Sequence, residues 1–122
     1  MKAHMEFACT KLAPDKIIRC AFGLTRQEFE LFLFLCHHQG PFTSKGLQKK
    51  FDINLATVQR ALKKLTEDDL VHRTQTNYEG GGYEFQYMLK SRPHIRKELK
   101  VRLDHWVHSV EQDVMQWSKN QF

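Results

Sequence analysis

Short polar and basic side chains follow Asn54 in a stretch with helical spacing, and their types suit contacts with nucleic acid. Ala56 offers a methyl group, Thr57 a methyl and a hydroxyl, Gln59 an amide and Arg60 a guanidinium fork. The DNA major groove admits a helix, and side chains of these kinds read the base edges on its floor. We therefore expect Ala56, Thr57, Gln59 and Arg60 to read bases.

Basic and hydroxyl side chains lie on both sides of these four in the sequence. Such groups neutralise or bind phosphates, which gives affinity and register without sequence information. The chain has 19 Lys and Arg against 14 Asp and Glu, so its formal charge of +5 favours an anionic partner without identifying it. The expected phosphate contacts are Thr43, Ser44, Lys45, Lys49, Lys50, Lys63, Lys64 and Arg73.

Cysteines and histidines offer a second kind of chemistry, a metal or thiol site. Cys9, Cys20, Cys36 and His37 would come together if the N-terminal segment folded back over the helix that contains Cys36. No CxxC pair is present, and the spacings match no standard zinc finger. We expect no metal and no cofactor, and a thiol- or metal-responsive regulator stays as an alternative. The odd number of cysteines gives no disulfide framework and indicates a reducing compartment, so we expect the cytoplasm.

Two further classes of function find no support in the residues. The glycine run Gly80–Gly82 lacks the GxxxxGK[ST] pattern and no helix opens after it, so it is not a phosphate-binding loop. No Ser/His/Asp order and no paired-carboxylate cleft can be argued, so we expect no enzyme. No apolar run approaches the length that crosses a bilayer, so we expect no membrane partner.

Start and stop signals divide the middle of the chain into three helices. Thr25 with Glu28 has the spacing of a capping box, and Gly40 with Pro41 would close that first helix. Thr43 would cap a second helix. Asn54 would cap a third at about 54–69, the one that carries the base-reading candidates.

The pattern changes after residue 70. A period of two predicts a β-hairpin at 71–90 with the glycine run at its turn. From Pro93, apolar residues at steps of three and four predict a helix of about 25 residues. A monomer of this size has little core left to cover this stripe, and we therefore expect a homodimer. The alternative is that the helix folds back over its own domain. The predicted interface is Ile95, Leu99, Leu103, Trp106, Val110, Val114 and Trp117.

The order of three helices, two strands and one helix predicts a mainly α fold with a small β-hairpin. It is the order of a winged helix-turn-helix with a long C-terminal dimerisation helix, in which the third helix enters the major groove and the hairpin is the wing. We expect residues 1–23 to be an extension with one short helix, 24–90 the DNA-binding domain and 91–122 the dimerisation helix.

The segment from Gly23 to Arg73 resembles the DNA-binding domain of TrmB-like and MarR-like winged-helix regulators. Its entry, "GLT..E", is more similar to TrmB, whereas "TVQRALKKL…DLVHR" is shared by many winged-helix families. The resemblance implies a dimeric transcription factor whose third helix reads a double-stranded DNA operator. These families usually have glycine where this chain has Asp69, which tolerates a left-handed backbone better than most residues. Full-length TrmB-like regulators carry a C-terminal sugar-binding domain, and this chain ends after one helix, so no sugar effector is implied and any effector stays unknown.

The hairpin turn has an unusual charge for a wing. It carries Glu79 and Glu84 and no Lys or Arg, whereas a wing that enters the minor groove normally has a basic residue. We expect a mobile wing whose phosphate contacts come from Arg73, backbone N–H groups or tyrosine hydroxyls. Because a fold does not fix function, the second hypothesis is a winged-helix protein–protein interaction module without specific DNA binding.

Overall fold

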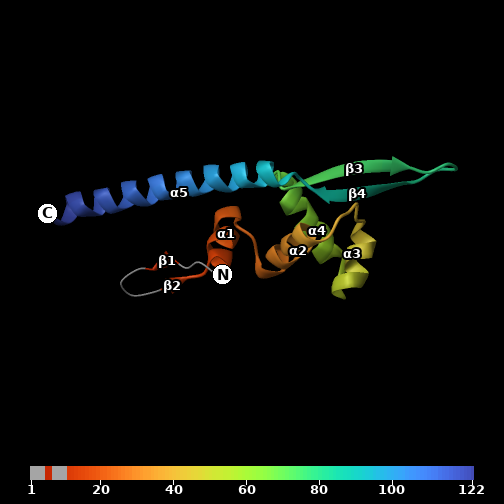
Figure 1. The fold of residues 1–122 in the computed structure, drawn as a ribbon, viewed down its shortest axis with the longest axis horizontal. Coiled ribbons are helices and arrows are strands. Elements are labelled where there is room, and N and C mark those ends of the chain that lie inside the picture. The colour runs from red at the N-terminus through yellow and green to blue at the C-terminus, as the bar shows by residue number, and fades with distance from the viewer. Residues whose placement is uncertain (1–4, 7–10) are drawn as a thin grey trace. The chain divides into compact units, whose positions relative to one another are not determined.

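The computed structural model describes residues 5–6 and 11–122, with side chains from residue 13 onward. It forms two compact units, one made of Leu24–Ile95 and the other of the residues up to Gly23 together with Arg96–Phe122. The elements are β1 (Met5–Glu6), β2 (Lys11–Leu12), α1 (Pro14–Phe22), α2 (Arg26–His37), α3 (Ser44–Phe51), α4 (Leu55–Glu67), β3 (Val71–Asn77), β4 (Tyr83–Leu89) and α5 (Arg92–Gln121) (Figure 1).

The first helix of the larger unit, α2, starts as predicted and ends earlier than predicted. The Thr25 hydroxyl accepts a hydrogen bond from the Glu28 amide, and the Glu28 carboxylate accepts one from the Thr25 amide, which completes the capping box. The helix ends at His37, before the expected stop at Gly40 and Pro41. The cause is His38, whose ring stacks on Phe34 at 4.1 Å and whose Nδ1 lies 2.9 Å from the Phe34 carbonyl oxygen. The ring thus occupies a carbonyl group that the helix end leaves without a partner.

The two following helices begin at the predicted caps. The Thr43 hydroxyl accepts from the Gly46 amide at 3.0 Å, and the Asn54 side chain accepts from the Ala56 amide at 2.7 Å. A Cβ at Gly46 would lie 3.1 Å from the Thr43 hydroxyl oxygen, so glycine suits this close approach despite its low helix propensity. These caps fix where α4 starts and therefore which of its residues point away from the core.

The core of this unit lies where α2, α3, α4 and the start of the hairpin meet. The apolar stripe predicted on the third helix is buried, since Val58, Leu62 and Leu65 are each at most 1% exposed. Burial of this kind supplies most of the stability of short helices. The buried apolar residues of the unit are Leu24, Phe29, Leu31, Phe32, Leu35, Leu47, Val58, Ala61, Leu62, Leu65, Leu70 and Val71.

The hairpin pairs β3 with β4 in antiparallel register, from Val71 opposite Leu89 to Asn77 opposite Tyr83. Phe42 and Tyr87 exchange two backbone hydrogen bonds of 2.9 and 2.8 Å, which ties the hairpin to the loop between α2 and α3. At the turn, Gly80, Gly81 and Gly82 have φ angles of 83°, 108° and 88°. This confirms that the glycines provide a backbone that other residues rarely adopt.

The turn between α4 and β3 depends on Asp69. Its φ of 64° confirms the left-handed conformation expected where related domains have glycine. Lys90 forms an ion pair with the Asp69 carboxylate and lowers the pKa of that carboxyl below its usual value. The Nε2 atom of His94 lies 2.8 Å from the Asp69 carbonyl oxygen. The end of α4 is thereby anchored to the end of the hairpin and to the first turn of α5.

In the smaller unit, α1 lies against α5. Pro14 stands in the first turn of α1, Gly23 ends the helix with a φ of 63°, and Phe22 is 2% exposed. The Arg102 guanidinium lies 5.2 Å from the centre of the Phe22 ring, a cation–π contact between the two helices. The helix α5 has 30 residues, longer than the predicted 25, and no described residue in it is buried.

Among the described residues, no helix is long and apolar enough to span a bilayer.

Candidate nucleic-acid interface

One face of α4 is exposed and carries three of the four predicted base readers. Ala56, Gln59 and Arg60 are exposed, and Lys63 continues the same face one turn further on. Positions three and four apart on a helix are neighbours, so these side chains form one surface. The opposite side of α4 is the buried stripe, which holds the helix in place. The result is a rigid helix that presents an amide and a guanidinium side by side.

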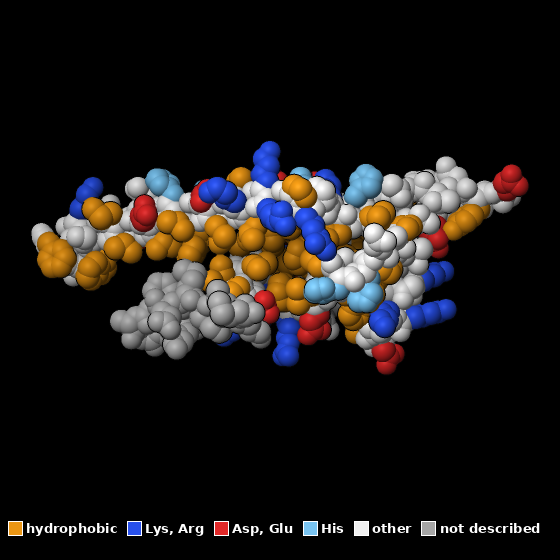
Figure 2. All heavy atoms as spheres, viewed as in Figure 1, with side chains coloured by type: hydrophobic (Ala, Val, Ile, Leu, Met, Phe, Trp, Pro, Cys, Tyr) orange, Lys and Arg blue, Asp and Glu red, His pale blue; other side chains and the backbone are white. Residues whose placement is uncertain are grey.

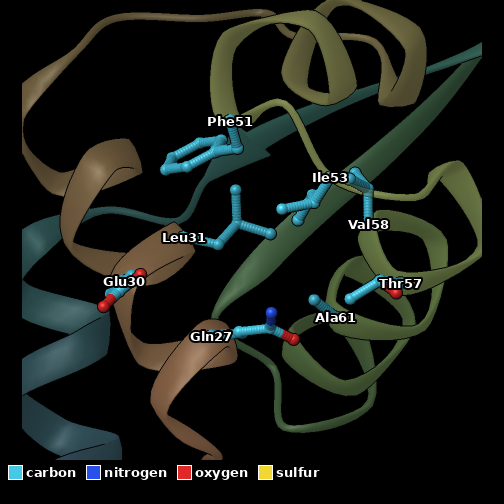
Figure 3. A pocket seen from close by; sticks show the side chains of 8 residues that line it. All are labelled: Gln27, Glu30, Leu31, Phe51, Ile53, Thr57, Val58 and Ala61. Carbon is cyan, nitrogen blue, oxygen red and sulfur yellow. The ribbon is translucent and has the colours of Figure 1, made fainter.

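Thr57, the fourth predicted reader, is turned toward a groove. It is half-buried and lies in a shallow cavity of about 70 Å³ between α2, the end of α3 and α4. Figure 3 shows Thr57 beside Ala61 on the α4 side of this groove, with Gln27 of α2 across from them. The structure therefore does not group Thr57 with the exposed surface of Ala56, Gln59 and Arg60. The groove is lined by Gln27, Glu30, Leu31, Phe51, Ile53, Thr57, Val58 and Ala61.

The predicted phosphate contacts separate into two sets. Lys45, Lys49 and Lys50 on α3 are exposed, and no described carboxylate lies within ion-pair distance of them. On α4, the Lys63 ammonium lies 4.0 Å from Glu67, and the Lys64 ammonium lies 3.2 Å from Asp68. The α3 lysines keep their charge available to an external anion, whereas those of α4 share it with a carboxylate on their own helix.

The hydroxyl candidates at the start of α3 are placed differently from each other. Thr43 uses its hydroxyl oxygen as the cap of the helix, although that hydroxyl still has a hydrogen to donate. Ser44 is half-buried at the first helical position. Both lie at a helix N-terminus, where backbone N–H groups favour an anion.

Arg73 on β3 has an aromatic partner. Its guanidinium carbon lies 4.2 Å from the centre of the Phe85 ring, and the edge of the Tyr83 ring packs on Phe85 at 5.3 Å. Arg73 is exposed, and no described carboxylate pairs with it. A guanidinium above a ring keeps its in-plane N–H donors free. The sequence did not predict the contact between Arg73 and Phe85, because the two residues lie on different strands.

The hairpin tip is closed by hydrogen bonds. The Tyr78 hydroxyl donates to the Glu84 carboxylate at 2.7 Å, which raises the pKa of Tyr78 above its usual value. The Tyr78 amide donates to the Gly82 carbonyl oxygen at 3.0 Å. The Gly80 to Gly82 backbone has open space around it, and Glu79 is exposed. The tip therefore presents carboxylate and tyrosine groups rather than cations.

Comparisons with known proteins agree with this arrangement. Residues 24–77, which hold α2, α3, α4 and β3, match the MarR family. The solved structure of a possible transcriptional regulator from Methanosarcina mazei Go1 is similar to this chain, with a TM-score of 0.85 and 28% identity. That similarity covers 96% of this chain and 98% of the other. The chain has a winged-helix fold and resembles the MarR family over residues 24–77.

Two further proteins resemble this MarR-like chain. The crystal structure of ST1889 protein from Sulfolobus tokodaii has a TM-score of 0.67 and 28% identity, over 78% of this chain and 92% of that one. An uncharacterized protein of Methanocaldococcus jannaschii, MJ1503, is 24% identical over 110 residues, 90% of this chain and 83% of its own. The match is to MarR, one of the two families that the sequence resembles, and the predicted winged helix with its long C-terminal helix is confirmed. These findings support a DNA-binding transcription regulator.

The two cysteines that the structure describes lie on different helices. Cys20 is exposed on α1, and Cys36 is half-buried on α2. Burial raises the pKa of the Cys36 thiol, which lowers its thiolate fraction at neutral pH. In the part of the chain that the structure describes, neither cysteine nor His37 belongs to a cluster of three metal-ligating side chains. Cys9, the remaining candidate, lies outside the described residues.

The apolar stripe of α5 divides into two parts. Ile95, Leu99 and Leu103 are half-buried, whereas the residues from Trp106 onward are exposed. Trp106 is 51% and Trp117 is 58% exposed, as are the valines between them to a similar degree. Val107, four residues after Leu103, lies on the same face, so periodicity alone could have added it to the predicted interface. Figure 2 shows these hydrophobic side chains gathered along α5.

Proposed function

We propose that this MarR-like protein binds a double-stranded DNA operator sequence-specifically as a homodimer. The exposed face of α4 lies in the major groove, and the hairpin 71–90 is the wing. The observation that carries the proposal is that Ala56, Gln59 and Arg60 share one exposed face of a helix whose other face is fully packed. A rigid helix with such a face has the chemistry and the dimensions that major-groove reading requires.

Each side chain of this face has a distinct role. The Arg60 guanidinium donates two hydrogen bonds to a guanine, the Gln59 amide pairs with an adenine, and the Ala56 methyl packs on a thymine methyl. Thr57, at the edge of the groove, adjoins this set rather than lying at its centre. Lys45, Lys49 and Lys50 bind phosphates, because no described carboxylate competes for their charge.

The exposed stripe of α5 supports the homodimer. A helix that exposes two tryptophans and several valines on one face leaves a large apolar surface in water. A second copy of α5 covers this surface, with Trp106, Val107, Val110, Val114 and Trp117 from each subunit in contact. Residues 24–90 then act as the DNA-binding domain and 91–122 as the dimerisation helix. Two winged helices joined in this way meet two half-sites related by the dimer axis.

Selection of bound oligonucleotides from a random pool tests the proposal. A consensus with two-fold symmetry is expected, since a symmetric dimer reads two copies of one half-site. Binding to the selected operator is expected to weaken steeply between low and moderate salt. A pool with no enriched sequence, together with no retention on a DNA column at low salt, would contradict the proposal and favour the protein-interaction module.

A further inference from the structure

The hairpin carries one cation whose position is fixed by an aromatic ring. In the β3–β4 register, Arg73 lies opposite Tyr87 and Gln75 lies opposite Phe85, so Arg73 and Phe85 are diagonal neighbours on one face. The 4.2 Å distance between the guanidinium carbon and the Phe85 ring centre is that of a cation–π contact. The contact limits the rotamers of a long side chain that otherwise moves freely in solvent.

Phe85 is itself held in place. Its ring is half-buried and receives the edge of the Tyr83 ring, with the two planes inclined at 65°. The same hairpin face begins with Val71 and Leu89, of which Val71 is 1% exposed and packs into the core. Arg73 is therefore an exposed residue on the same face of the hairpin as the buried Val71.

The charge of Arg73 is not neutralised within the described part of the chain. Two other exposed cations of the same unit do have carboxylate partners, since Arg26 has Glu30 at 3.5 Å and Lys63 has Glu67 at 4.0 Å. No such partner is found for Arg73 among the described residues. Because a ring covers only the flat face of a guanidinium, its edge donors stay available for two hydrogen bonds to one phosphate.

The carboxylate at the far end of the hairpin, Glu79, is too far from Arg73 to cancel its charge. Asn77 lies four positions along the strand from Arg73, which is a distance of about 13 Å at the usual rise of a strand. The screening length at physiological salt is about 8 Å, so Glu79 beyond Asn77 has little effect on an anion bound at Arg73. Glu84, opposite Thr76, is nearer, but it lies on the other face of the hairpin from Arg73 and accepts a hydrogen bond from the Tyr78 hydroxyl.

We propose that Phe85 is a positioning residue that holds Arg73 as the phosphate contact of the wing. The phosphate belongs to the operator backbone, so this inference rests on the proposed function. The contact is made at the base of the hairpin, and the tip with Glu79 stays away from the DNA backbone.

The test uses the full chain and the selected operator, with dissociation constants measured over a salt series. Wild type is compared with Arg73→Ala, Phe85→Leu, Phe85→Tyr and the double variant Arg73→Ala/Phe85→Leu. Removing the cation in Arg73→Ala is expected to reduce the slope of log affinity against log salt by about 1. Loss of the cation–π contact in Phe85→Leu is expected to weaken binding about 2- to 5-fold with the slope nearly unchanged, because the charge is retained.

Two comparisons separate positioning from a general structural role. Phe85→Tyr, which keeps an aromatic ring under the guanidinium, is expected to bind as wild type does. Phe85→Leu is expected to have no further effect once Arg73 is alanine, because the two residues act through one contact. Gln86→Leu, next to Phe85 on the other face of β4, is the matched control and is expected to leave affinity unchanged.

The outcomes distinguish this inference from the proposed function. Wild-type protein that binds no operator would overturn both. If the wild type does bind the operator, two results would overturn the inference alone. One is that the Phe85→Leu variant binds the operator as tightly as wild type. The other is that Phe85→Leu weakens binding by the same factor whether residue 73 is arginine or alanine.

Discussion

The helices α4 and α5 both carry an apolar stripe at helical spacing, but they differ in what covers it and in what they expose. In α4 the stripe is packed, with Leu62 and Leu65 0% exposed, and the outer face is polar and basic. In α5 the stripe itself is exposed from Trp106 onward. A packed stripe makes a helix a rigid support for polar side chains, whereas an exposed stripe is an apolar surface available to a partner. This difference is the basis on which we propose DNA reading for α4 and self-association for α5.

The first way to break this comparison is to remove an apolar side chain from each stripe. Leu62→Ala is expected to lower the free energy of unfolding by roughly 2–5 kcal/mol, because it leaves a cavity in a packed core. Val114→Ala is expected to change monomer stability by less than about 0.5 kcal/mol, because its site is exposed in the subunit. Urea unfolding at low protein concentration, where subunits dissociate, measures both. Equal losses would mean that α5 is packed within its own subunit.

A second test introduces a charge on either side of α5. Val110→Lys is expected to weaken dimerisation by about 2–3 kcal/mol, because an unpaired ammonium would be buried between subunits. Val101→Lys is the matched control, since nine residues, or two and a half turns, place it on the opposite side of the helix. Sedimentation equilibrium over a concentration series measures both association constants. Equal effects of the two substitutions would exclude the predicted stripe as the interface.

A third test sharpens the role of the lysines. Lys49→Ala combined with Lys50→Ala is expected to reduce the slope of log affinity against log salt by about 2. Lys63→Ala combined with Lys64→Ala is expected to reduce it less, because Glu67 and Asp68 already share those charges. Fluorescence anisotropy with the selected operator gives both slopes. A larger reduction for the α4 pair would reverse the assignment of the phosphate contacts.

The smallest effect is expected at the hairpin tip. Replacing Gly80, Gly81 and Gly82 together by a shorter Asn-Gly turn is expected to change operator affinity by less than about 0.5 kcal/mol, because the tip carries carboxylates and no cation. Circular dichroism would check that the hairpin persists. A large loss of affinity with intact folding would show that the tip is a contact.

Local signals predicted much of the fold because they act within a few residues. The capping box at Thr25, the caps at Thr43 and Asn54, and the left-handed Asp69 are all local geometry, and the structure has each of them. The early end of α2 depends on a ring stacked over Phe34, which helix-stop rules do not include. The helical periodicity predicted the apolar stripes of both α4 and α5, because it depends only on the spacing of apolar residues. It does not indicate what packs against a stripe.

The candidate site was less accessible from the sequence. Thr57 adjoins Val58, and only the packing of α2 against α4 shows that its side chain lines a groove. The pairing of Lys64 with Asp68 is visible as an i, i+4 spacing, but its half-buried geometry is not. The contact between Arg73 and Phe85 requires the strand register, which depends on the exact length of the turn.

The most direct test of the account concerns Arg60, the strongest hydrogen-bond donor on the exposed face of α4. Affinity for the selected operator and for unrelated DNA would be measured at one salt concentration for wild type, Arg60→Ala and Lys119→Ala. The last variant removes an equal charge from the final turn of α5. We predict that Arg60→Ala weakens operator binding by about 1–3 kcal/mol more than it weakens binding to unrelated DNA, while Lys119→Ala leaves that ratio unchanged. An Arg60→Ala variant that keeps the wild-type ratio would contradict the assignment of α4 as the reading helix.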